Sequence, residues 1–433
     1  MVPEQAAGVS QSGPVDSVSR LPFTLRHLVI ILLAVFLVLA PFVRRHGTLP
    51  DYGVLVAIWS TVCLCIVVAV FALSGRGRIP LTAQDRAVTL FTIIAVLAAV
   101  WGMRRGASAQ DVAGDLLPFP VLFAFYCVGR WLYTARDRPA SRQLAVLLLA
   151  CYVANTVVSL FEFTVLGVGA THGFRLGGIL LPRLNPGFTP ALIFFFGLLL
   201  TRSRDRTLAA SGLTAAVLMM ILSLGRSHWV GIAAAVPVGL YAVRGRTWYM
   251  IRRYSRALVV IFAAVFASLF LATLAIDVPV DELLAARAAG STQLEAEDVA
   301  TRLVEFQDGV RVALQNPLGI GLGGRIYTYV AGVGRSWTNY LHNSYVEIWL
   351  KMGILGLAVV LWVFLLSLKQ SYMLYRLTNQ PVFLAILLGL FAIYVGTNFS
   401  PYTNKIFGTA FLGLVLGSLQ TDYDHLQRSM NDR

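Results

Sequence analysis

The sequence is poor in charged residues and almost lacks lysine. Charged residues make up 13% of its 433 residues, against about 25% in a typical soluble domain. Hydrophobic residues make up 57%, and 32 of the 35 basic residues are arginine. This composition excludes an ordinary soluble protein and indicates a polytopic membrane protein, in which each span takes about 20 residues.

Cysteine is also rare. The four cysteines lie within apolar runs, where a thiol acts as a small hydrophobic side chain. No Cys-x-x-Cys pair, no Cys/His spacing and no acidic cluster typical of a metal site occurs in the sequence. We therefore predict no metal and no cofactor.

Twelve apolar runs predict an all-α polytopic membrane protein with about 12 transmembrane helices and one large helical loop. The polar residues 1–24 predict a disordered tail. The first run lacks a small-residue cleavage site and more spans follow it, so we predict a transmembrane helix there and not a signal peptide. The predicted spans are 25–43, 52–75, 87–103, 112–133, 144–166, 188–201, 208–224, 229–243, 257–275, 345–367, 381–398 and 406–420. Residues 25–275 thus hold spans 1–9, 276–344 form a loop domain, 345–420 hold spans 10–12, and 421–433 form a C-terminal tail.

The placement of arginine predicts the orientation. A net charge of +14 would suit a nucleic-acid-binding protein, but the basic residues lie in short loops between apolar runs, as the positive-inside rule expects. We therefore predict no nucleic-acid partner. Loops on the side of the N-terminus carry far more arginine than the short loops opposite, so both termini are predicted to be cytoplasmic. The 276–344 loop is then extracytoplasmic; its residues 281–314 have helical spacing, and the glycine-rich stretch 317–324 ends that helix.

His342 is an ionisable residue that leads directly from this loop into an apolar span. Such a residue is costly at a membrane and indicates a functional site. On a helix at 100° per residue, Tyr345, Trp349, Gly353 and Gly356 form a stripe below His342. The stripe predicts either ordinary helix packing or a groove for a lipid tail. Glu347 and Lys351 form an i,i+4 pair on the opposite face.

Several arginines are predicted on the same side as His342. Arg226 lies in the turn between spans seven and eight, Arg302 in the large loop, and Arg175 in the loop between spans five and six. Arginine binds phosphate oxygens in a bidentate manner, so these residues suggest an anionic, phosphorylated ligand. For Arg302, a salt bridge to Glu305 or another nearby acid is the alternative interpretation.

The pattern H-[N/S/Q]-x9-G-x-x-G, met by His342, Asn343, Gly353 and Gly356, resembles the signature of bacterial O-antigen ligases. Arg302 followed by residues 316–323, and the Ser/Arg turn 223–229, also resemble that family, over roughly residues 175–356. One departure is the order Gly225-Arg226-Ser227, because members often place serine directly before the arginine.

This resemblance implies a glycosyltransferase of the bacterial inner membrane, with a periplasmic active site. The donor would be a glycan on undecaprenyl pyrophosphate, and the acceptor a sugar hydroxyl of lipid A–core. His342 would be the general base, and Arg226 and Arg302 would neutralise the leaving pyrophosphate, with Arg175 a weaker candidate. Asn343 would orient the acceptor or cap the span. The resemblance implies inversion at the anomeric carbon.

Two other functions remain open from the sequence. A polysaccharide polymerase of the same superfamily would join repeat units on the lipid carrier and shares the same layout. A transporter or flippase for lipid-linked glycans would need buried mid-membrane charges and inverted repeats. We find no clear repeat between the two halves of the sequence, which disfavours the transporter.

Overall fold

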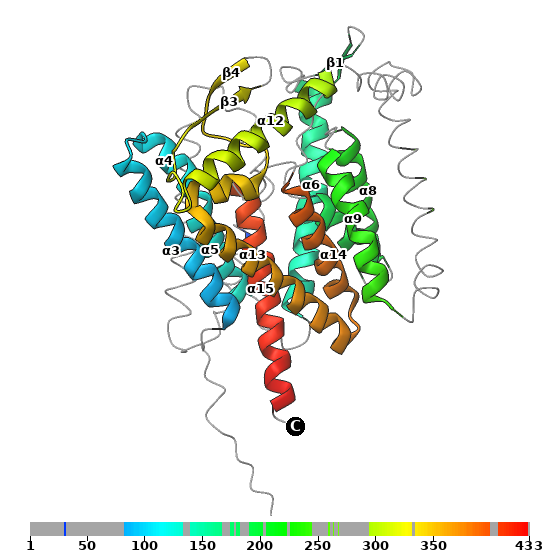
Figure 1. Ribbon diagram of the computed structural model, residues 1–433. Coiled ribbons are helices and arrows are strands. Elements are labelled where there is room, and N and C mark those ends of the chain that lie inside the picture. The colour runs from blue at the N-terminus through cyan, green and yellow to red at the C-terminus, as the bar shows by residue number, and fades with distance from the viewer. Residues whose placement is uncertain are drawn as a thin grey trace, which may run out of the picture.

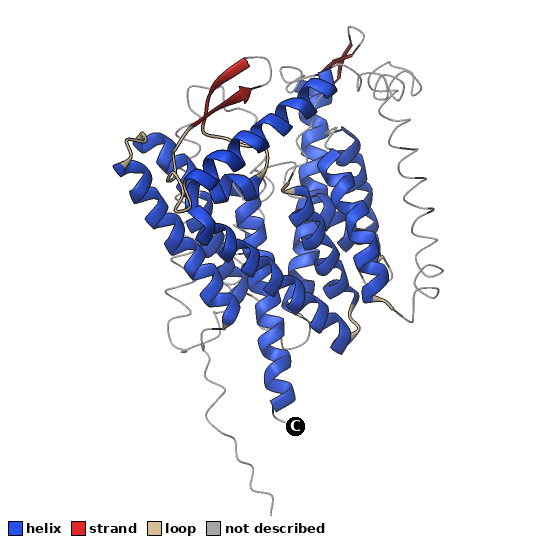
Figure 2. Cartoon of the chain, viewed as in Figure 1, coloured by secondary structure: helices blue, strands red, loops and turns tan. Residues whose placement is uncertain are grey.

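The computed structural model describes residues 30–31, 82–132, 139–166, 174–176, 179–181, 190–201, 205–222, 226–244, 259, 263, 267, 294–330, 334–398 and 406–431. Within these ranges the chain is a helical bundle with two small β-hairpins at one end (Figures 1 and 2). The helices are α3 (Ala83–Arg104), α4 (Ala109–Leu116), α5 (Pro118–Leu132), α6 (Ala140–Leu166), α7 (Pro190–Leu200), α8 (Arg206–Leu222), α9 (Arg226–Ala242), α12 (Leu294–Gln315), α13 (Ser344–Thr378), α14 (Pro381–Gly396) and α15 (Ile406–Asn431).

Apart from α12, the described helices overlap the predicted spans from the third to the eighth and from the tenth to the twelfth. The fourth span is divided between α4 and α5, and α13 and α15 extend beyond the predicted limits. Four are long and apolar enough to cross a membrane: Ala83–Arg104, Ala109–Arg130, Ala140–Leu160 and Ser344–Thr378. Four more are apolar but shorter: Pro190–Leu200, Arg206–Met220, Ser227–Ala242 and Pro381–Gly396. These helices support a membrane protein but do not confirm the number of about 12 spans. The predicted spans 25–43, 52–75 and 257–275 and the tail 1–24 lie outside the described residues, apart from isolated positions.

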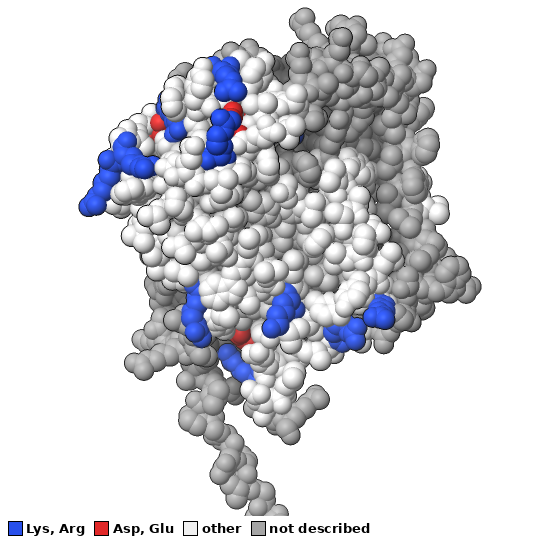
Figure 3. Space-filling model, viewed as in Figure 1, with Lys and Arg blue, Asp and Glu red and all other residues white. Residues whose placement is uncertain are grey.

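Charged side chains gather toward the two ends of the bundle. On the face shown in Figure 3, Lys and Arg of the described residues form an upper and a lower group, and the surface between them is almost uncharged. The exposed side chains of α3 in this region are apolar, including Ile93, Leu97 and Val100. Such a belt is what a helical bundle presents to hydrocarbon, where charged side chains are costly.

Close helix packing relies on glycine in α5 and α15. A Cβ added to Gly413 or Gly417 of α15 would lie 2.4 Å and 2.1 Å from carbonyl oxygens of α5, and one added to Gly129 of α5 would lie 2.4 Å from a carbonyl of α15. Small residues of this kind let the backbones of membrane helices approach closely. At the lower end of this pair, Arg130 forms ion pairs with Asp85 of α3 and Asp424 of α15.

The described residues are mostly helical, as predicted, and two small hairpins add to the helices. β1 (Phe174–Leu176) pairs with β2 (Ile179–Leu181), and β3 (Ile326–Val330) pairs with β4 (Gly334–Thr338), both antiparallel. In β3, buried Ile326 and Thr328 alternate with exposed Tyr327 and Tyr329, the period of two that a half-buried strand shows. The loop prediction for 276–344 missed this alternation. The helix expected from residue 281 is described from Leu294 onward, as α12.

Helix α13 is broken at Gly353, where φ is 72° and ψ is −176°. The glycine-rich segment 316–324 supplies the hydrogen bonds that the break removes. The amides of Ile320 and Gly321 donate to the carbonyls of Leu350 and Lys351, at 2.8 and 3.1 Å, and the amide of Ile354 donates to the carbonyl of Pro317 at 3.0 Å. Since an unpaired backbone group in a membrane costs several kcal/mol, this segment makes the break possible.

The same segment also contacts α3. The amide of Leu322 donates to the carbonyl of Ala98 at 3.0 Å, and the indole of Trp101 donates to the carbonyl of Gly319 at 3.1 Å. A Cβ on Gly102 would lie 1.9 Å from the carbonyl oxygen of Leu322. The segment is therefore held between two spans, and it fixes the C-terminal end of α12 relative to α13.

Candidate active site

His342 is held by Glu305 of α12. The imidazole Nδ1 lies 2.7 Å from Oε2 of Glu305, and the backbone amide of His342 donates to the same oxygen at 3.4 Å. The Glu305 side chain is 5% exposed and the His342 side chain 33% exposed. A carboxylate accepts hydrogen bonds, so Nδ1 carries the proton and Nε2 is left as the basic nitrogen. A histidine held in this way has the geometry that general-base chemistry needs.

Apolar packing between α12 and α13 sets this contact. Leu341, Val346 and Leu350 form a small buried cluster with Ala313 of α12 and Ile326 of β3. The ring of Tyr340 meets that of His342 edge-on, with 5.3 Å between the centroids. Glu305 therefore reaches His342 because one face of α12 is buried against the start of α13.

Arg302 lies one turn before Glu305 on α12. Residues three apart on a helix have Cβ atoms about 5–6 Å apart, so Arg302 is near the His342–Glu305 pair. Its side chain is partly buried. The carboxylate of Glu305, the alternative partner predicted for Arg302, is hydrogen-bonded to His342.

Arg226 is the first residue of α9 and lies at the same end of the bundle as His342. Helix α9 packs antiparallel to α14: Gly231 approaches the carbonyl of Ala392, and Gly239 approaches Leu388. The end of α14 in turn contacts the start of α13, because the amide of Ser344 donates to the carbonyl of Thr397 at 3.1 Å. The backbone contacts thus place Arg226 and His342 at neighbouring helix ends.

Arg175 lies in β1, opposite Leu180 of β2. In Figure 1 this hairpin is at the same end of the molecule as α12 and the β3–β4 hairpin. No described contact links Arg175 to His342. The structure therefore places Arg302 one helical turn from Glu305, the partner of His342, Arg226 at the same end of the bundle, and Arg175 only on the same side.

Asn343 caps helix α13. Its Oδ1 accepts hydrogen bonds from the amides of Tyr345 and Val346, at 3.0 and 3.1 Å, and its Nδ2 donates to Oδ1 of Asn398 at 3.4 Å. These contacts match one of the two roles expected for it, the cap. The hydroxyl of Tyr345 donates to the carbonyl of Tyr394 at 2.7 Å.

The predicted stripe assumed a continuous helix, and the break at Gly353 changes its phase. Tyr345 packs against the large core and Trp349 against the small cluster around Leu341. A Cβ on Gly353 would lie 2.6–2.8 Å from backbone atoms of Pro317 and Leu318, and one on Gly356 would lie 2.4 Å from Cβ of Met352. The glycine-rich segment therefore fills the space beside Gly353, and the four residues of the stripe do not form one continuous helix face.

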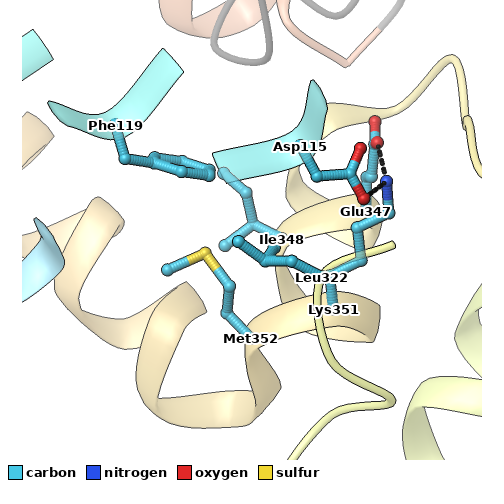
Figure 4. Close-up of a pocket in the computed structure, with 7 residues that line it drawn as sticks. All are labelled: Asp115, Phe119, Leu322, Glu347, Ile348, Lys351 and Met352. Carbon is cyan, nitrogen blue, oxygen red and sulfur yellow. Dashed lines mark hydrogen bonds and ion pairs between the residues drawn. The ribbon is translucent and has the colours of Figure 1, made fainter. Parts of the chain in front are cut away.

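A buried ion cluster lies beside the site. Nζ of Lys351 is 2.8 Å from Oε1 of Glu347, as the sequence spacing predicted, and also 2.8 Å from Oδ2 of Asp115 in α4. Figure 4 shows these three side chains converging, with Phe119, Ile348 and Met352 lining the pocket next to them. Among the described residues, no group of three or more His, Cys, Asp and Glu side chains is arranged to hold a metal ion.

Sequence reasoning missed the roles of Glu305 and Asp115. In the sequence, Glu305 stands out only as a partner of Arg302, three residues before it on the same helix face. Asp115 is a carboxylate within an apolar run, which was a usable signal. Nothing in the sequence pairs it with Lys351, since the two are more than 200 residues apart.

Comparison with known proteins supports the resemblance seen in the sequence. No curated protein matches the chain. Residues 189–361 match the family model described as O-antigen ligase, and this range holds Arg226, Glu305 and His342. It ends within α13, beyond the glycines of the histidine pattern. This match over residues 189–361 supports membership of the O-antigen ligase family.

Proposed function

We propose that the protein transfers a glycan from undecaprenyl pyrophosphate to a sugar hydroxyl of lipid A–core, at the periplasmic face of the bacterial inner membrane. The observation that carries this proposal is the His342–Glu305 pair, with Arg302 one turn away, inside the segment that matches the O-antigen ligase family. Both termini are then cytoplasmic, in line with the arginine distribution.

The chemistry follows from the orientation of His342. Glu305 binds Nδ1–H, so Nε2 takes the proton of the attacking hydroxyl. The acceptor oxygen forms a bond to the anomeric carbon while the bond from that carbon to the pyrophosphate oxygen breaks. Attack from the face opposite the leaving group inverts the anomeric centre. Imidazolium forms next to the Glu305 carboxylate, which stabilises its charge.

Arginine would neutralise the leaving group. Undecaprenyl pyrophosphate gains negative charge as the glycan departs, and guanidinium groups bind such oxygens bidentately. Arg302 lies one turn before Glu305 on α12, and Arg226 begins a helix at the same end of the bundle. Two arginines that bind the pyrophosphate would serve the role that a divalent cation has in many phosphate sites, so the reaction is proposed without a metal or cofactor.

The test uses the purified full chain with undecaprenyl-pyrophosphate-linked glycan and lipid A–core extracted from the same bacterium. We expect glycan attached to lipid A–core and no lengthening of the donor when the core is omitted. Lengthening of the lipid-linked glycan without lipid A–core would identify the protein as a polymerase. Movement of the donor across vesicle membranes without any transfer would identify it as a transporter.

A further inference from the structure

Lys351 is a buried cation that the proposed chemistry does not use. Lys351 lies in the N-terminal part of α13, two residues before the break at Gly353, and the residue is 4% exposed. Burying a charge is costly unless it is paired and hydrogen-bonded. Many buried ion pairs can be replaced by apolar residues without loss of stability, so the presence of this one calls for a role other than stability alone.

The ammonium group joins three segments of the chain. It contacts Glu347 of α13 and Asp115 of α4, each at 2.8 Å, and it donates to the backbone carbonyl of Asn339. These three partners use all three N–H groups of the lysine. The same Asp115 oxygen accepts the amide of Gly323 at 2.7 Å, so the glycine-rich segment is tied to the cluster as well.

The carbonyl of Asn339 is the contact that matters for His342. Residues 339–343 connect β4 to α13, and His342 lies within them. The far end of this connection is fixed by Asn343, which caps α13. The near end is fixed by Lys351, which reaches back from two turns along α13 to Asn339. The backbone that carries His342 is thus held at both ends.

We propose that Lys351 is a positioning residue, which clamps Asn339 and so holds the His342 backbone at hydrogen-bond distance from Glu305. This inference rests on the proposed role of His342 as the base. The clamp acts through the backbone, because Lys351 contacts the chain three residues before His342 and not the imidazole. Without the hydrogen bond from Lys351 to Asn339, residues 339–343 can move. The His342 imidazole then no longer points at the acceptor hydroxyl.

A second ion cluster offers a matched control. Arg130 is also a largely buried cation with two carboxylates, Asp85 and Asp424, but it lies at the opposite end of α5 from the segment around Asp115. Replacing either cation by methionine removes a buried charge from a membrane helix. The two substitutions differ in that only Lys351 contacts the connection that carries His342.

The experiment compares full-length Lys351→Met and Arg130→Met in lipid nanodiscs with the wild type. Amide hydrogen exchange is measured for the peptide covering residues 339–343, and kcat and KM are measured with extracted donor and lipid A–core. For Lys351→Met we expect faster exchange in that peptide and a kcat lower by about 10- to 100-fold, with KM within about twofold, because a misplacement of about 1 Å costs on that order. Arg130→Met should change neither the exchange of this peptide nor kcat.

A double variant keeps the inference testable if Lys351→Met does not fold. Lys351→Met with Glu347→Gln removes one of the two carboxylate charges that the single variant leaves without a cation, while Asp115 keeps the hydrogen bond from the Gly323 amide. We expect the same fast exchange and low kcat. Wild-type exchange and wild-type kcat in this variant would overturn the inference. A wild-type protein with no transferase activity would instead overturn the proposed function, and the exchange comparison would still decide whether Lys351 holds residues 339–343.

Discussion

The carboxylate of Glu305 decides which nitrogen of His342 can accept a proton. It lies 2.7 Å from Nδ1 and is almost fully buried, so Nδ1 keeps its hydrogen and Nε2 is available. His342 could be predicted from the sequence, because an ionisable residue at the start of an apolar span stands out. Glu305 could not, because it is 37 residues away and meets His342 only when α12 packs on α13.

The first prediction concerns Glu305→Gln. Glutamine can still accept from Nδ1 but cannot stabilise the imidazolium, and its amide can donate to Nδ1 and reverse the tautomer. We expect kcat to fall by about 10²–10³-fold with little change in KM, within the range for general-base catalysis. Glu305→Asp, which keeps the charge, is the control and should retain more activity. Steady-state kinetics with extracted donor would check this, and equal activity of the two variants would contradict it.

The second prediction separates the two roles expected for Asn343. Asn343→Ala removes the cap of α13 and should destabilise the protein by about 1 kcal/mol, measured by thermal unfolding in detergent. Asn343→Asp keeps the capping oxygen and should have nearly wild-type stability and kcat. A low kcat in a stable Asn343→Asp variant would show instead that the side-chain amide contacts the acceptor.

The glycine-rich segment 316–324 and the broken helix α13 depend on each other. Gly353 has φ of 72°, and its Cα faces the backbone of Pro317 and Leu318. The sequence indicated that residues 317–324 end a helix, and this was right for the end of α12. The break in α13 could not be predicted from the sequence pattern. Placing residues on a helix at a fixed angle assumes that the backbone hydrogen bonds continue, and at Gly353 they are replaced by hydrogen bonds from segment 316–324.

The third prediction follows from this packing. Gly353→Ala places a methyl group within 2.8 Å of backbone atoms at a positive φ, so we expect a loss of about 2 kcal/mol or more of stability, from strain and from displacement of the segment. Gly114→Ala in α4 is the control, because nothing lies within 4 Å of its added Cβ and its φ is not positive. It should be neutral or slightly stabilising. Equal melting temperatures for both variants would contradict the proposed dependence.

The described helices run between two opposite ends of the molecule. Helix α12 and the β3–β4 hairpin lie at one end, and the C-terminus lies at the other (Figure 1). His342 belongs to the first end, because it binds Glu305 of α12. Apolar runs predicted the positions of most described helices to within a few residues, because hydrophobic length is what a membrane selects. The runs could not show that α15 continues through the predicted tail to Asn431, since that part is polar and is held by contacts such as Asp422 with the start of α6.

The fourth prediction tests the orientation. In a cysteine-free background, Arg335→Cys at the exposed β4 strand should react with a membrane-impermeant maleimide in intact cells. Arg428→Cys, exposed near the end of α15, should react only after the inner membrane is broken. The positive-inside distribution requires this order of labelling, and the reverse order would contradict the periplasmic site.

The most direct test of the account is the transfer rate of His342→Ala, measured with the purified full chain, extracted donor and lipid A–core. His425→Ala, an exposed histidine near the other end of the bundle, is the control. The account predicts that His342→Ala stays folded and loses about 10²–10⁴-fold in kcat, the usual contribution of a general base, while His425→Ala transfers at the wild-type rate. Wild-type transfer by His342→Ala would contradict the account.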